Sequence, residues 1–157
     1  MAREHLATYL NDHLAGSMAA LEHLRDLEQT APAMAPALAE LRCDIESDRK
    51  ALESLIHRLG LTESRARQAG AWLAEKAARL KMRVDDRAGG PLRRLEGLEA
   101  VALGIDGKLA LWRALGAAAE AAPDLRAVDY QHLAERARDQ RERVEALRLE
   151  AAREALA

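Results

Sequence analysis

Residues that break helices are rare in this sequence, and they separate long runs in which apolar residues recur every three or four positions. Pro and Gly gather in segments 30–36, 85–91 and 115–129, and Gly60 follows another such run. Pro suits the first turn of a helix and Gly suits its end, so these positions mark helix boundaries. The intervening runs predict long helices over residues 3–29, 35–59, 91–115 and 130–156, and a shorter helix over about 64–83.

The composition favours an all-α chain, because good helix formers supply most of its apolar content. Hydrophobic residues make up 49% of the sequence, but aromatic residues only 3%, and Phe is absent. Ala and Leu dominate, and β-branched residues are scarce. The length of 157 residues is enough for one domain with one sizeable core. We therefore expect a single all-α domain over residues 1–157.

Charge and cysteine content narrow the classes of function. The formal net charge of −2 gives no reason to expect nucleic acid as a partner. Cys43 is the only cysteine, which excludes an internal disulfide and a Cys-based zinc site. The sequence has no apolar run of about 18 residues and no signal-peptide apolar region near its start. We therefore expect a cytoplasmic protein without a membrane partner.

The connections between the long runs predict how the helices lie. The links after the first and third long helices are short, so each link should join antiparallel neighbours. About thirty residues separate the second and third long helices, which is enough to cross the bundle and return to the same end. We therefore expect a four-helix bundle with a helix-containing crossover. The alternative is five sequential antiparallel helices, which we favour less because the 64–83 helix is short and weakly apolar.

Each long run carries one polar residue on or beside its apolar stripe. His13, Asp48 and Gln140 stand at the centres of their stripes, and Glu99 stands toward the border of its own. All four lie within about one turn, roughly 6 Å, of their helix midpoints. They should therefore meet in one polar layer of the core. The residues expected beside that layer are small: Gly16, Ser17, Ala20, Ala102 and Gly104.

This polar layer has two interpretations. The one we favour is a structural hydrogen-bond network, in which Asp48 pairs with His13 or Gln140. On that interpretation Asp48→Leu should be tolerated, and His13→Ala should destabilise the fold by leaving Asp48 unpaired. The other interpretation is a metal site formed by His13, Asp48, Glu99 and Gln140, since carboxylates and imidazoles bind divalent metals in bundle cores.

Three glycines fall inside the third long run, at Gly97, Gly104 and Gly107. Each costs about 1 kcal/mol relative to Ala within a helix, so close helix packing is the simplest reason for them. A phosphate-binding loop is a weak alternative, because no strand precedes the glycines. We expect Trp72 and Trp112 to pack between the crossover helix and the bundle.

The chain resembles ferritin-like proteins in its helix number, helix lengths, crossover and mid-bundle polar layer, over nearly its whole length. It is also similar to a set of uncharacterised bacterial ferritin-like proteins. The stretches that carry this similarity are YLNDHLAGSMAALE, IESDRKALESLIHRLG, AWLAEKAARLKMR, LEGLEAVALGIDGKLALW and RDQRERVEALRLEAAREAL. The resemblance implies a ferritin-like four-helix bundle.

The sequence departs from the di-iron pattern of that family. The di-iron members use one Glu on the first and third helices and Glu-x-x-His on the second and fourth. Here Ile45 and Asp48 occupy the pair on the second helix, and Gln140 stands on the fourth. His13 stands where the first Glu is expected, and only Glu99 keeps the family residue type. These ligands are too few for two irons, so we expect no ferroxidase activity and at most one divalent metal ion.

Two function classes stay open, because the sequence names neither a substrate nor a reaction. The first is a non-catalytic scaffold, homodimer or binding module. The second is a degenerate Fe, Mn or Zn protein with redox activity.

Overall fold

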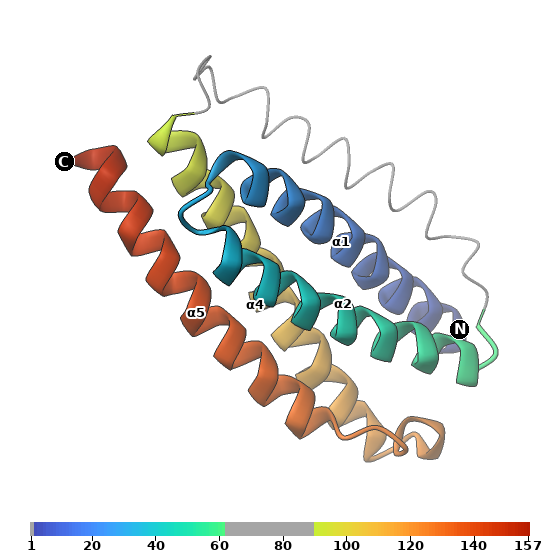
Figure 1. Ribbon diagram of the computed structural model, residues 1–157. Coiled ribbons are helices and arrows are strands. Elements are labelled where there is room, and N and C mark those ends of the chain that lie inside the picture. Colours follow the sequence, from blue (N-terminus) through green and yellow to red (C-terminus); the bar gives the residue numbers. More distant parts are fainter. Residues whose placement is uncertain (1, 62–89) are drawn as a thin grey trace.

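The computed structural model describes residues 2–61 and 90–157, and these residues form an all-helical bundle (Figure 1). The elements in chain order are α1 (Ala2–Thr30), α2 (Ala35–Arg58), α4 (Pro91–Ala119), the short 3₁₀ helix η2 (Pro123–Leu125) and α5 (Tyr130–Leu156). No strand occurs within the described ranges, so the all-α prediction is confirmed for them. The predicted helix over 64–83 and Trp72 lie outside the described residues.

The helix ends follow the signals in the sequence at most boundaries. Gly90 and Pro91 start α4, and Asp129 caps α5 by accepting a 2.9 Å hydrogen bond from the backbone N–H of His132. Gly60, just after α2, has a φ of 60°, a left-handed conformation that side-chain-bearing residues rarely adopt. These local signals explain why the boundaries of α2 and α5 match the sequence prediction closely.

The predicted end of α4 at residue 115 is wrong, because α4 continues to Ala119. Gly116 does not end the helix, and the three alanines that follow it favour continuation. A Cβ built on Gly116 would lie 3.5 Å from the Cβ of Tyr130. Gly116 therefore lets the first residue of α5 pack closely against α4.

The helices form two antiparallel hairpins, α1 with α2 and α4 with α5 (Figure 1). The start of α1 meets the end of α2 where Arg3 Nη2 donates to the Leu59 carbonyl at 2.7 Å. The end of α1 meets the start of α4 where His23 Nε2 lies 3.1 Å from the Gly97 carbonyl oxygen. Since α1 is antiparallel to both α2 and α4, the helices α2 and α4 run in the same direction (Figure 1).

The core is built mainly from leucines on the inner faces of these helices. Leu10, Leu24, Leu38, Leu55 and Leu98 are completely buried. Burial of each such side chain contributes about 1.5–3 kcal/mol to folding. The inner faces of all four long helices therefore share one hydrophobic core.

Trp112 is 1% exposed and is the largest fully buried side chain among the described residues. Its ring stacks on that of Tyr130, with the ring centroids 6.4 Å apart. Trp112 therefore joins α4 to the start of α5. The contact that we expected between Trp112 and the crossover helix lies outside the described residues.

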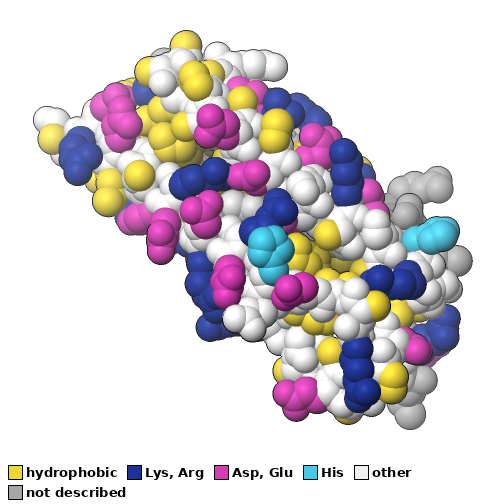
Figure 2. Space-filling model, turned by 60° about the horizontal axis from the view of Figure 1, so that its bottom comes forward, with side chains coloured by type: hydrophobic (Ala, Val, Ile, Leu, Met, Phe, Trp, Pro, Cys, Tyr) yellow, Lys and Arg dark blue, Asp and Glu magenta, His cyan; other side chains and the backbone are white. Residues whose placement is uncertain are grey.

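The outer surface carries charges of both signs. Figure 2 shows acidic and basic side chains interspersed on one face, with hydrophobic side chains in small groups. None of the helices within 2–61 and 90–157 is both long enough and apolar enough to cross a bilayer.

Candidate functional site: a buried polar layer and its pocket

Asp48 lies inside the bundle, with 1% of its surface exposed. It shares the inner face of α2 with Ile45 and Leu52, at spacings of three and four residues that bring side chains to one side of a helix. Gln140 of α5 is equally buried, and its Nε2 donates to Asp48 Oδ2 at 2.8 Å. The prediction that Asp48 is buried and pairs with His13 or Gln140 is therefore confirmed, with Gln140 as the partner.

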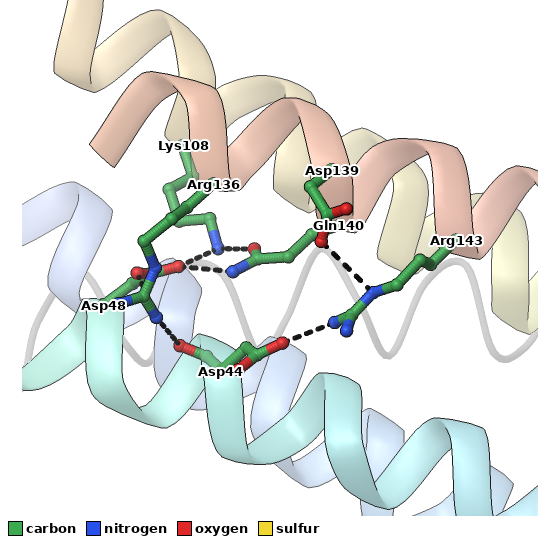
Figure 3. A network of polar contacts seen from close by, with 7 residues as sticks. All are labelled: Asp44, Asp48, Lys108, Arg136, Asp139, Gln140 and Arg143. Carbon is green, nitrogen blue, oxygen red and sulfur yellow. Dashed lines mark hydrogen bonds and ion pairs between the residues drawn. The ribbon is translucent and has the colours of Figure 1, made fainter. Parts of the chain in front are cut away.

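The counterion of Asp48 is Lys108 of α4, which we did not predict as a member of the layer. Lys108 Nζ lies 2.6 Å from Asp48 Oδ2 and also donates to Gln140 Oε1 (Figure 3). Three helices thus contribute one side chain each to a closed triangle of hydrogen bonds. We call Asp48, Lys108 and Gln140 the polar triangle.

Burial changes the proton affinity of Lys108, whose side chain is only 13% exposed. Desolvation lowers the pKa of Lys108 below its ordinary value, because the charged form loses water. The charge of Asp48 and its hydrogen bond act in the opposite direction. The ion pair is therefore what keeps a buried ammonium tolerable at this depth.

Arg136 of α5 brings a second cation to Asp48. Its Nη2 lies 3.1 Å from Asp48 Oδ1 and donates to the Asp44 backbone carbonyl at 3.3 Å. The Asp44 carboxylate accepts a 2.5 Å hydrogen bond from Arg143, which also lies 3.5 Å from Asp139 (Figure 3). The charged contacts thus continue from the polar triangle to the surface along α2 and α5. Around Asp48 itself, two cations surround one carboxylate.

Glu99 does not belong to the layer, which corrects our expectation. Its side chain is 49% exposed, and its carboxylate pairs with Arg148 at 3.4 Å. The neighbouring positions Leu98 and Ala102 of α4 are buried, and position 99 is turned about 100° from Leu98. A position at the border of the stripe therefore faces water here.

His13 lies on α1 and is half-buried, and among the described residues no hydrogen bond or ion pair joins it to Asp48. Its ring meets the edge of the Tyr9 ring, with centroids 4.7 Å apart and planes at 77°. Burial lowers the pKa of His13, and the nearby charge of Asp12 opposes that shift. His13→Ala therefore would not unpair Asp48, contrary to our expectation from the sequence.

A signal for Lys108 was present in the sequence. The buried stripe of α4 contains Val101, Ile105, Trp112 and Leu115, and Lys108 falls between them at helical spacing. Its position on this stripe predicts burial as strongly as the position of Asp48 does on its own. We missed it because lysine is usually a surface residue.

The residues near Asp48 do not fit a metal site. Among the described residues, no group of three or more His, Cys, Asp or Glu side chains is arranged to hold a metal ion. Lys108 Nζ already lies against Asp48 Oδ2, which is where a cation would bind. A divalent metal ion would also be repelled by the two cations that surround this carboxylate.

A pocket of about 590 Å³ lies beside the polar triangle, between α1, α2 and α4. Asp48 and Lys108 reach its wall, and so does His13. Much of the remaining wall is apolar or small, and it includes Gly16, Ala20, Ile45, Leu52, Leu111 and Trp112. The small residues predicted beside the layer thus leave a hollow there rather than close packing.

Gly97, Gly104 and Gly107 of α4 show how α1 and α4 separate toward this pocket. A Cβ on Gly97 would lie 2.8 Å from Leu27 Cδ2, so the helices are in close contact there. A Cβ on Gly104 would lie 4.0 Å from the Cβ of Ala20, and one on Gly107 would meet nothing within 4 Å. The expectation of close packing is therefore right at Gly97 and wrong at Gly107.

Comparison of the chain with protein-family models, with curated proteins and with solved structures gave no match. The ferritin-like resemblance therefore stays a prediction, and the case for a function depends on the geometry of the triangle and its pocket.

Proposed function

We propose that the chain is a non-catalytic binding module, in which the polar triangle fixes the packing of the helices and the adjacent pocket takes a small ligand. The observation that carries this proposal is the 2.6 Å contact between Lys108 Nζ and Asp48 Oδ2 at the wall of a pocket of about 590 Å³. A volume of this size is typical of small-molecule sites, which range over about 300–1,000 Å³. The polar groups at its wall would orient the ligand.

The bonding of the polar groups argues against catalysis in the pocket. Asp48 accepts hydrogen bonds from Lys108 and Gln140, so its carboxylate is engaged and poorly placed to remove a proton from a substrate. Ser17 Oγ donates at 2.6 Å to the Leu14 carbonyl, so this hydroxyl is paired with the backbone and not with a general base. The pocket thus contains polar groups suited to recognition.

We also propose the ferritin-like topology for this bundle. The support is that α2 and α4 run in the same direction. A chain that joins two parallel helices must cross the length of the bundle, from the end of the first helix to the start of the second. On this proposal the triangle occupies the level at which a ferritin-like protein holds its metals, with Lys108 in place of the cation. A cytoplasmic location and the absence of a nucleic-acid partner belong to the same proposal, with support from composition alone.

Metal titration tests the structural role of the triangle. The full chain is purified without chelators, analysed for Fe, Mn and Zn, and titrated anaerobically with Fe(II) before exposure to oxygen. We expect no stoichiometric metal and no absorbance of oxo-bridged Fe(III). One bound metal per chain that disappears in Asp48→Asn would contradict the proposal. If the bound metal also disappeared in Glu99→Gln, the predicted metal site of His13, Asp48, Glu99 and Gln140 would be supported instead.

Binding of a neutral apolar probe tests the pocket. In a Trp72→Phe background, Trp112 is the only tryptophan and lies at the pocket wall. We expect saturable changes in its fluorescence with 1-octanol, and loss of these changes in Gly107→Leu, which fills the pocket. Lys50→Met, an exposed change on α2, is the matched control and should bind normally. No saturable response in the parent chain would contradict the binding module.

A further inference from the structure

Two side chains at the pocket wall, Lys108 of the polar triangle and Trp112, have hydrogen-bond donors without an acceptor among the described residues. An ammonium carries three N–H donors, and the described residues give Lys108 two acceptors, Asp48 and Gln140. Trp112 is 1% exposed, and its indole N–H has no acceptor among the described residues. Both side chains line the pocket. A buried donor without an acceptor costs free energy, which a ligand with a suitable oxygen would recover.

The charge beside the pocket is also unbalanced. Lys108 and Arg136 both lie within 3.1 Å of Asp48, so the cluster carries one positive charge more than its carboxylate neutralises. Arg143 pairs with both Asp44 and Asp139, so the wider network adds one negative charge, but these two carboxylates are 40% and 68% exposed and their charges are screened by solvent. An anion at Lys108 would balance the cluster in a region where charges interact strongly.

The other charges at the pocket wall are near the solvent. Asp12 is exposed, and Arg49 forms a 2.7 Å ion pair with Glu53. Exposed charges are screened by water and salt, so they interact with a charged ligand in the pocket more weakly than the buried Lys108 does. The remaining wall is mostly apolar, with Ile45, Leu52 and Leu111 among its residues.

We infer that the pocket binds an amphipathic monocarboxylate, with its carboxylate on Lys108 and its apolar body against Ile45, Leu52 and Leu111. This inference rests on the proposed binding module and names the class of its ligand. One carboxylate oxygen accepts from Lys108 Nζ, and Trp112, which also lines the pocket, has a buried indole N–H without an acceptor among the described residues. A neutral molecule of the same shape would fill the apolar part but would leave the positive charge unbalanced.

The experiment compares octanoate, 1-octanol and octylammonium, which share one apolar chain and differ in charge. Affinities are measured by Trp112 fluorescence in the Trp72→Phe background at constant ionic strength. We expect octanoate to bind at least about tenfold more tightly than 1-octanol, and octylammonium to bind most weakly. The preference for octanoate should vanish in Lys108→Met and persist in Lys50→Met.

Two further variants keep the test decisive if Lys108→Met fails to fold. The double variant Asp48→Leu/Lys108→Met removes both members of the ion pair, and it should bind octanoate and 1-octanol equally. Trp112→Phe, followed by calorimetry, should weaken octanoate more than 1-octanol. Equal affinity of the parent chain for the two probes would overturn the inference but leave the binding module standing. Failure of all three probes to bind would overturn both.

Discussion

The bundle is closed at the level of Gly97 and hollow at the level of Lys108, although the same helices α1 and α4 border both regions. At Gly97 the helices are so close that a Cβ would lie 2.8 Å from Leu27. Near Lys108 a pocket of about 590 Å³ lies between α1, α2 and α4. The comparison indicates that a buried polar contact can hold helices at a fixed distance from one another without filling the space between them. Apolar side chains stabilise the closed region by packing.

The largest expected change in the free energy of unfolding is at the level of Lys108, where the bundle is hollow. Lys108→Met would leave Asp48 buried without its closest cation, and breaking a buried ion pair costs about 3–5 kcal/mol. Chemical denaturation should therefore show a drop of that size in the free energy of unfolding. Lys50→Met, at an exposed position, is the control and should change stability by less than about 0.5 kcal/mol. Equal stability of the two variants would mean that Arg136 and Gln140 are enough to stabilise the buried carboxylate of Asp48.

Gly97→Ala tests the closed level. Leu27 is 4% exposed and His23 Nε2 lies 3.1 Å from the Gly97 carbonyl, so neither neighbour of the new methyl group can move freely. Overpacking costs about 1–3 kcal/mol, and the gain in helix propensity offsets about 1 kcal/mol of it. The net loss of about 1 kcal/mol should appear in thermal and chemical unfolding. A stabilised Gly97→Ala variant would show that the region is less tightly packed than the structure indicates.

Gly107→Ala is the matched substitution at the hollow level. No atom lies within 4 Å of the added Cβ, so only the helix propensity changes. The free energy of unfolding should rise by about 1 kcal/mol. A loss of stability instead would place Gly107 in a close contact and remove the contrast between the two levels.

The smallest expected effect is a pH dependence at the pocket wall. Burial lowers the pKa of His13 below its ordinary value of 6.5, so the unfolded chain binds a proton before the folded chain does. The stability contribution of a neutral His13 is therefore complete above pH 6.5 and is lost as the pH falls through the folded pKa. Unfolding measured between pH 7 and 5 should show a smaller decline in His13→Gln than in the parent.

Much of the fold followed from local signals in the sequence. Pro91, Gly60 and Asp129 mark helix ends by backbone properties that need no knowledge of the tertiary structure. Asp48 and Gln140 were found because each interrupts an apolar stripe at its centre. The end of α4 was missed because Gly116 is needed for a contact with Tyr130, which only the packed structure reveals.

The site was predicted only in part, for reasons that depend on helix rotation and spacing. Glu99 lies at the edge of a stripe, where a small rotation decides between core and solvent. Lys108 lies on a stripe but is absent from the predicted polar layer, and its presence reverses our expectation for Asp48→Leu. That variant would now leave a buried ammonium without its carboxylate, so it should destabilise the protein. The pocket depends on the distance between α1 and α4, which no local pattern encodes.

A double-mutant cycle between Asp48 and Lys108 tests most directly whether the polar triangle is a structural ion pair. The free energies of unfolding are compared for the parent, Asp48→Leu, Lys108→Met and the double variant. We expect both single variants to be strongly destabilised and the double variant to lose about 2–3 kcal/mol less than the sum of the two single losses, which is the coupling energy. Additive effects with a coupling energy near zero would contradict this account, because Asp48 would then depend on some other partner.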